Sequence, residues 1–309
     1  MDILGMTVRR LSVPLAALAV AALGLVAAGC GGSAGAIPEL SSLTQVANTS
    51  ASADTAKFAL TFEMNLPGAD QSLSFDAEGG FDTPAKRSQL TIDLSSLAEL
   101  MKQVGSSLGG KVTGDLGDSS DWKLEAITDG DVVYLQFPLI AKELPDGKTW
   151  VKGNAREFSK TGTSGLDQFG TLSGMDPRDV FGFLKAVSGS IDAVGSEKVR
   201  GVSTSHYRAT LNPAKLTALV PAEQRQSLAG VDEAARQAGL TALPLDVWVD
   251  EDQRIRRLSI DLDAKMPGSD ESIMASFVVE LYDYGMPLVL DLPPADQVVD
   301  AATLKPKSS

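Results

Sequence analysis

Apolar and polar residues alternate with a period of two along much of the chain. In residues 57–66, KFALTFEMNL, every second side chain from Phe58 onward is apolar, and the same alternation recurs at 72–81, 87–94, 256–266 and 272–284. This period is typical of strands that bury one face and expose the other, as strands of antiparallel sheets do. We therefore predict strands in these segments. Shorter runs predict further strands at 122–128, 131–137, 149–153, 191–199, 202–211 and 244–250.

Helical spacing of three and four is confined to a few segments between these strands. Residues 96–108 carry an apolar stripe behind a capping box, and 175–189 carry a second stripe behind Asp176 as the predicted cap. Two short helices are predicted within 212–239, and a weaker one at 39–53.

The predicted fold class is α+β, with one curved antiparallel sheet and helices against its apolar face. The helices either fill the space over that face or leave a cavity lined by apolar side chains, and the sequence leaves both readings open. The candidate lining residues are Phe62, Met64, Phe75, Leu90, Ile92, Val180, Phe181, Leu184, Ile260 and Phe277.

The beginning of the chain has the pattern of a secretory signal peptide. Arg9 and Arg10 precede an uncharged apolar run, and the small residues 27–29 precede Cys30, the single cysteine. This order resembles a bacterial lipobox, which predicts cleavage before Cys30 and a diacylglyceryl group on its thiol. An uncleaved anchor is the alternative, because about 20 apolar residues span a bilayer core. The arginine pair leaves the export route open between the general secretory and the twin-arginine pathways.

These features divide the chain into four parts. We predict a lipoprotein signal peptide at 1–29, a flexible tether at 30–39, a single domain at 40–300 and a disordered tail at 301–309. A lipidated Cys30 leaves no thiol for a disulfide within the chain, so the domain must depend on an apolar core.

The charge of the chain limits its partners. Of 40 acidic and 27 basic side chains, Asp2, Arg9 and Arg10 lie in the signal peptide, which leaves a net charge of −14 for the rest. A strongly acidic protein is a poor partner for nucleic acid and for anionic lipid head groups. The lipid chains on Cys30 are therefore expected to provide the membrane attachment.

Residues that carry catalytic or metal-binding chemistry are sparse. The single histidine, His206, lies on the more polar side of its predicted strand, where we interpret it as a solvated side chain, and it would have to serve any histidine-based triad. One histidine and a lipidated cysteine cannot supply a zinc site. The acidic loop at 115–125 does not have the ligand spacing of an EF-hand. Asp261 and Asp263 leave a carboxylate pair for glycoside cleavage open. We expect no cofactor and no enzymatic activity.

Several segments together resemble a known family. The lipobox, FALTFEMNLPG, DGDVVYLQFP, LPDGKTWVKG, VGSEKVRGVSTSHYRATLN and YDYGMPLVLDLPPADQVVD follow one another as in actinobacterial envelope lipoproteins of the LppX/LprG type. The resemblance covers about 40–300. It implies a LolA-like fold, in which an antiparallel half-barrel carries helices on its concave face. It also implies the binding of long-chain lipids or glycolipids in some members and no catalytic residues.

Two functions follow as hypotheses. The leading one is a lipoprotein, anchored at the outer face of the cytoplasmic membrane, that binds or carries an acylated lipid or glycolipid. The alternative is a non-catalytic scaffold or interaction lipoprotein of the cell envelope, which predicts a filled core and an exposed apolar patch for an envelope protein partner. A hydrolase is a third, less favoured class, and it would require a buried carboxylate pair.

Overall fold

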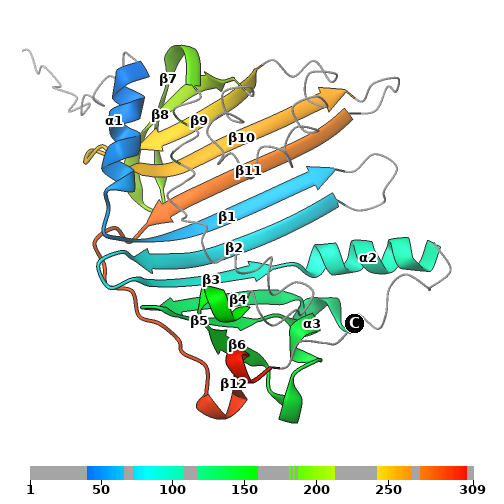
Figure 1. Ribbon diagram of the computed structural model, residues 1–309. Helices are drawn as coiled ribbons and strands as arrows, with labels where there is room; N and C mark the ends of the chain where they lie inside the picture. Colours follow the sequence, from blue (N-terminus) through cyan, green and yellow to red (C-terminus); the bar gives the residue numbers. More distant parts are fainter. Residues whose placement is uncertain are drawn as a thin grey trace, which may run out of the picture. The chain divides into compact units, whose positions relative to one another are not determined.

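The computed structural model (Figure 1) describes most of the predicted domain. The described residues are 40–65, 72–107, 117–158, 181, 184, 187–212, 242–265 and 272–304. Cys30 and Val180 lie outside these ranges, as do the predicted signal peptide, the tether and nearly all of 212–239. In the part of the chain that is described, no helix is long and apolar enough to cross a membrane.

Twelve strands within the described residues form one sheet, and all eleven predicted strands are among them. Their bounds are β1 (Thr55–Asn65), β2 (Ser72–Asp82), β3 (Arg87–Asp93), β4 (Lys123–Asp129), β5 (Val132–Gln136), β6 (Trp150–Gly153), β7 (Val187–Val199), β8 (Val202–Leu211), β9 (Leu243–Val249), β10 (Ile255–Lys265), β11 (Ser272–Tyr282) and β12 (Val298–Asp300). The strand β12 is not predicted, because three residues are too few to show a period of two.

The strand order is β12-β6-β5-β4-β3-β2-β1-β11-β10-β9-β8-β7. Neighbouring strands are antiparallel except β12, which pairs with β6 in parallel. The pair β1–β11 joins the N-terminal and C-terminal strands in the middle of the sheet, with Phe62 opposite Phe277. The predicted antiparallel sheet is therefore confirmed.

Helices are few and short in the described residues. The two longest are α1 (Leu40–Ala51) and α2 (Ser95–Ser107), both predicted. Short turns of helix complete the set: α3 (Pro138–Ala141), α4 (Ala155–Phe158), η1 (Ser119–Asp121), η2 (Pro145–Gly147), η4 (Ala295–Gln297) and η5 (Ala301–Thr303). The predicted layer of helices over a concave face is not confirmed by these elements.

Two predicted boundaries are wrong. The helix predicted at 175–189 cannot include its last residues, because Val187 begins β7, pairs with Leu211 of β8 and is buried. The predicted tail at 301–309 starts too early. Ala301 is only 2% exposed and begins η5 directly after β12, so burial orders the chain at this point.

Two separate apolar clusters form the core. The first gathers Leu43, Val46 and Ala47 of α1 with side chains of β1 and β7–β11. The second includes Ala98 of α2 and Trp122, together with side chains of β4, β5, β6 and β12. Each long helix therefore covers a different part of the sheet.

A buried hydroxyl ties α1 to the sheet. Ser50 is fully buried; its Oγ donates to the carbonyl of Val46 at 2.8 Å and accepts the backbone N–H of Ile255 at 2.9 Å. The hydroxyl of Tyr284 donates to the carbonyl of Ile255 at 2.7 Å, and burial raises the pKa of Tyr284. Both backbone groups of Ile255 are thus satisfied by side chains, as a buried peptide requires.

Candidate ligand-binding face

Strand register places the apolar side chains of four neighbouring strands in one row. Phe75 of β2 lies opposite Phe62 of β1, Phe62 lies opposite Phe277 of β11, and Phe277 lies opposite Ile260 of β10. We call these four residues the central row. Because neighbouring strands lie about 4.8 Å apart, the row extends for about 14 Å across the sheet. The rings of Phe62 and Phe75 stack, with centroids 4.7 Å apart.

On this face, the side chains become more exposed along the strands as the distance from α1 increases. Phe58 and Leu281, which face each other next to α1, are 6% and 1% exposed. Further along, all four residues of the central row are only half-buried, and so is Met64, the next apolar residue of β1. This end of the apolar face is therefore less covered than the end next to α1.

The predicted lining residues therefore fall into separate groups. Phe62, Met64, Phe75, Ile260 and Phe277 share the half-buried region of the apolar face. Of these, Ile260 and Phe277 pack against the first cluster, as does Leu90, whereas Ile92 packs against the second.

Two predicted lining residues belong to the core itself. Phe181 and Leu184 are 2% and 1% exposed inside the first cluster, so they are filled core in this structure. Leu60, on the same face of β1 as Phe62, is half-buried and packs against the same cluster. It was not among the predicted lining residues, although its place in the alternation of β1 could have indicated it.

A hollow of about 590 Å³ lies where β1, β10 and β11 approach their ends. Its lining includes Glu63, Asp261, Asp263 and Met274. Register puts these four residues on the face opposite to the central row, whereas Met64, Leu262 and Ala275 of the same lining share the face of the central row. Among the predicted lining residues, Met64 borders this hollow. Its two aspartates are exposed, not buried as a glycosidase pair would be.

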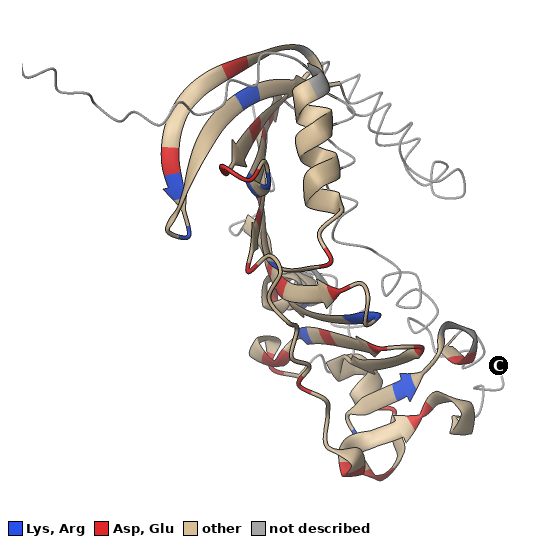
Figure 2. Cartoon of the chain, turned by 90° about the vertical axis from the view of Figure 1, so that its left-hand side faces the viewer, with Lys and Arg blue, Asp and Glu red and all other residues tan. Residues whose placement is uncertain are grey.

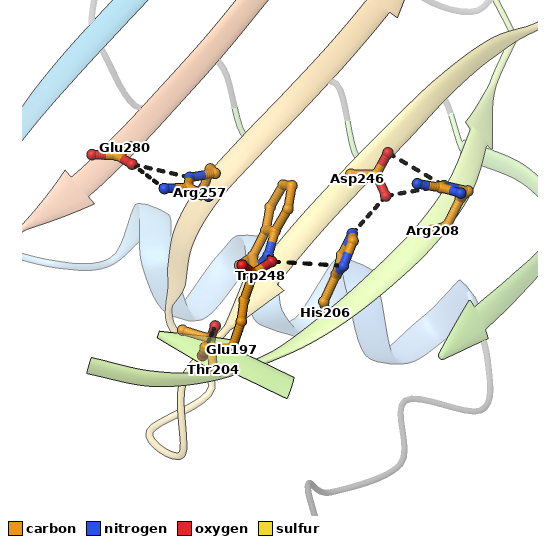
Figure 3. Close-up of polar contacts among 8 residues, drawn as sticks. All are labelled: Glu197, Thr204, His206, Arg208, Asp246, Trp248, Arg257 and Glu280. Carbon is orange, nitrogen blue, oxygen red and sulfur yellow. Dashed lines mark hydrogen bonds and ion pairs between the residues drawn. The ribbon is translucent and has the colours of Figure 1, made fainter. Parts of the chain in front are cut away.

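The opposite, polar face carries a network of side chains from β7 to β11 (Figure 3). Nε2 of His206 lies 2.6 Å from Oδ1 of Asp246, and Nε of Arg208 donates to the same oxygen at 3.0 Å. The ring of His206 stacks on Trp248 at 4.2 Å, and the indole N–H of Trp248 donates to Glu197. These contacts join three adjacent strands.

His206 is on the polar face, as predicted, but it is not solvated. The side chains of His206 and Asp246 are 13% and 11% exposed, because Asp246 and Trp248 of β9 cover the ring. Within the described residues, the partners of the imidazole are carboxylates and an indole ring, so the geometry fixes the imidazole rather than presenting it to a nucleophile.

A pair of arginines in this network, Arg257 and Arg200, holds Glu280 of β11. Arg257 donates from Nε at 3.0 Å and from Nη2 at 2.6 Å, and Arg200 donates from Nε at 2.6 Å. Burial alone would raise the pKa of Glu280, but the hydrogen bonds and charges of Arg257 and Arg200 outweigh it and hold the pKa below its ordinary value. The network therefore reinforces the outer side of the sheet opposite the apolar face.

No cluster of three or more metal-binding side chains occurs in the described ranges. On the polar face, His206, Asp246 and Glu280 make the contacts described above.

Comparison with known proteins gives the following matches. No family model matches the chain. An uncharacterized 31.2 kDa protein of Streptomyces griseus, from the rplA–rplJ intergenic region, is 31% identical over 157 residues, which cover 50% of this chain and 48% of that protein. The chain thus spans about half the length of this curated relative.

The solved structures that match include LppX, a lipoprotein of Mycobacterium tuberculosis, and LprF of Mycobacterium bovis. LppX from Mycobacterium tuberculosis covers 82% of this chain and 97% of its own, with 16% identity and a TM-score of 0.42. The match with LprF from Mycobacterium bovis covers 83% of this chain and 98% of LprF, with 15% identity and a TM-score of 0.42. The match with a LolA superfamily protein from Nitrosomonas europaea covers 84% of this chain and 96% of that protein, with 9% identity and a TM-score of 0.24.

Proposed function

We propose that this protein is a non-catalytic lipoprotein of the cell envelope that holds an acylated lipid or glycolipid against its central row. The observation that carries this proposal is the partial burial of Phe62, Phe75 and Phe277 on a face whose residues next to α1 are fully buried. A folded chain that gained nothing from this region would be expected to close it with its own side chains.

The chemistry of an acyl chain suits this surface. Each buried CH₂ group contributes about 0.8 kcal/mol, and apolar walls suffice to obtain it. Partly covered aromatic side chains offer such walls without any polar group that would have to be desolvated. Lipid binding here therefore needs no catalytic residue.

The location follows from the sequence. We propose that the thiol of Cys30 carries the lipid anchor at the outer face of the cytoplasmic membrane, after export of the chain. Labelled palmitate should enter the parent protein and not a Cys30→Ser variant, which should leave the membrane fraction. Equal labelling of both variants would refute the anchor.

Lipid binding is tested by mass spectrometry of the purified protein under native conditions, together with uptake of a fluorescent fatty acid. We expect a bound mass of an acylated lipid, and displacement of that lipid by the fluorescent probe. A protein that shows neither a bound lipid nor uptake, although it is folded, would refute the proposed carrier function.

A further inference from the structure

The connection between β11 and β12 exposes a ridge of apolar side chains. Residues 285–294, which we call the strap, run from β11 to η4 across the ends of β1, β2 and β3 and are drawn orange to red in Figure 1. Met286, Val289 and Leu292 of the strap are 60%, 80% and 49% exposed. Three large apolar side chains at a spacing of three residues, all open to water, are unusual on a single short segment.

The strap is held in place along its length. At its start, the N–H of Gly285 donates to the carbonyl of Thr55 at 3.1 Å. In the middle, Leu288 lies over Gly80, where an added Cβ would come within 2.8 Å of its Cδ1, and the N–H of Asp291 donates to Oε1 of Gln89 at 3.2 Å.

Beyond the strap, the N–H of Thr149 donates to the carbonyl of Gln297 at 3.1 Å. These anchors make the exposed ridge preformed, so a partner that binds it would lose little free energy in ordering the strap.

The backbone of the strap is also open. Within the described residues, the N–H groups of Leu288, Val289, Leu290 and Leu292 make no hydrogen bond to protein. Unpaired backbone donors beside exposed apolar side chains are the features that an extended segment of another chain recognises.

Charge decides which partner fits. Residues 284–304 contain Asp291, Asp296 and Asp300 and neither Lys nor Arg, and Figure 2 shows acidic positions along this connection. Asp300 lies 3.9 Å from Lys152, and Nζ of Lys148 donates to the backbone carbonyl of Asp296 at 3.0 Å, but the carboxylates of Asp291 and Asp296 form no ion pair among the described residues. A second copy of the chain would place these carboxylates next to the same carboxylates of the other copy, which repel them, and an anionic membrane would repel them as well.

We propose that the strap is a docking surface for another protein, whose apolar groove is bordered by Lys or Arg. Met286, Val289 and Leu292 would enter the groove, and Asp291 and Asp296 would face its basic border. This interaction is separate from the lipid-binding face, because the strap is not part of the central row.

The test places a photoreactive phenylalanine analogue at Val289 of the full-length lipoprotein in the organism that produces it. The matched control has the same analogue at Val194, an exposed valine of β7 that is 49% exposed. We expect position 289, and not 194, to give one protein adduct, in which the partner's crosslinked peptide lies in an apolar surface flanked by Lys or Arg.

Binding of the identified partner is then measured with the purified full-length variants. Val289→Asp should weaken binding at least tenfold and Val194→Asp less than twofold, and binding should weaken as salt rises. An adduct with a second copy of this chain or with lipid would overturn the proposal, and so would the lack of an adduct specific to position 289. Partner affinity that is unchanged by Val289→Asp or by salt would also overturn it. Lipid content, measured on the same variants, reports separately on the proposed carrier function.

Discussion

Two phenylalanines on the same face of β1 allow the lipid-binding face to be separated from the core. Phe58 and Phe62 are four residues apart, so their side chains point to the same side of the sheet. Phe58 is 6% exposed, belongs to the cluster beneath α1 and lies over Gly79. Phe62 is half-buried and stacks on Phe75. Phe58→Ala and Phe62→Ala therefore remove the same atoms from two different environments.

The expected losses of stability differ accordingly. Truncating a fully buried phenylalanine costs about 3–5 kcal/mol, since the transfer free energy is lost and a cavity remains. For Phe62, the partial burial and the stack on Phe75 together give about 2 kcal/mol. At about 2–4 °C per kcal/mol for a domain near this size, Phe58→Ala should lower Tm by about 10 °C and Phe62→Ala by about 5 °C.

The affinity for lipid should fall more in Phe62→Ala than in Phe58→Ala, the reverse of the order in stability. Removing part of the wall at Phe62 loses about 1 kcal/mol of apolar contact with a bound acyl chain, which is roughly a fivefold loss of affinity. Phe58 lies beneath α1, so folded Phe58→Ala protein should keep the affinity of the parent within about twofold.

The assay combines thermal unfolding with titration of a fluorescent fatty acid at a temperature where both variants are folded. The reasoning would be wrong if Phe58→Ala and Phe62→Ala lost equal stability while fatty acid affinity stayed unchanged in both. In that case Phe62 would be ordinary core. The variant Phe62→Leu, which keeps an apolar side chain, should restore most of the affinity.

Three further predictions concern the supports of the sheet. Ser50→Ala should lower the free energy of unfolding by about 1–3 kcal/mol in denaturant titrations, because it leaves a buried N–H unpaired, whereas Ser52→Ala, at an exposed hydroxyl, should change it by less than about 0.5 kcal/mol. Asp250→Ala should cost about 3 kcal/mol in the same titrations, because Arg256, now 2.5 Å from Asp250, would keep a largely buried charge without its partner. The lowered pKa of Glu280 means that its contribution to stability is complete above its ordinary pKa of 4.5 and is lost as pH falls through the lower folded-state pKa. Glu280→Gln should therefore flatten the decrease of Tm with pH below about 4.5, and an unchanged acid profile would contradict this assignment.

The sequence alone does not identify which residues face each other on neighbouring strands. The alternation places His206 on the polar side of β8, but its contact with Asp246 depends on the register of β8 against β9, which are joined through a long intervening segment. Side-chain alternation fixes the face of a strand, and only tertiary pairing fixes its neighbour. For this reason the sequence indicates a solvated histidine where the structure has a covered one.

The same distinction explains where the predictions about the apolar face hold and where they do not. Phe62, Phe277 and Phe181 are equally apolar, and the sequence offers no means to tell a half-buried wall from filled core. Their burial depends on α1 and on strands that are distant in the chain. The strap at 285–294 is apolar at most positions, so the sequence does not indicate which of its side chains are exposed, and only their burial in the structure does.

The sequence by itself determined which segments are strands, which face of each is apolar and how acidic the chain is, because these properties depend on neighbouring residues. The tertiary structure decided the pairing of β1 with β11, the separation into two cores and the partly open central row. These features arise from contacts between residues far apart in the chain, whose free energy depends on which surfaces meet and how completely they exclude water.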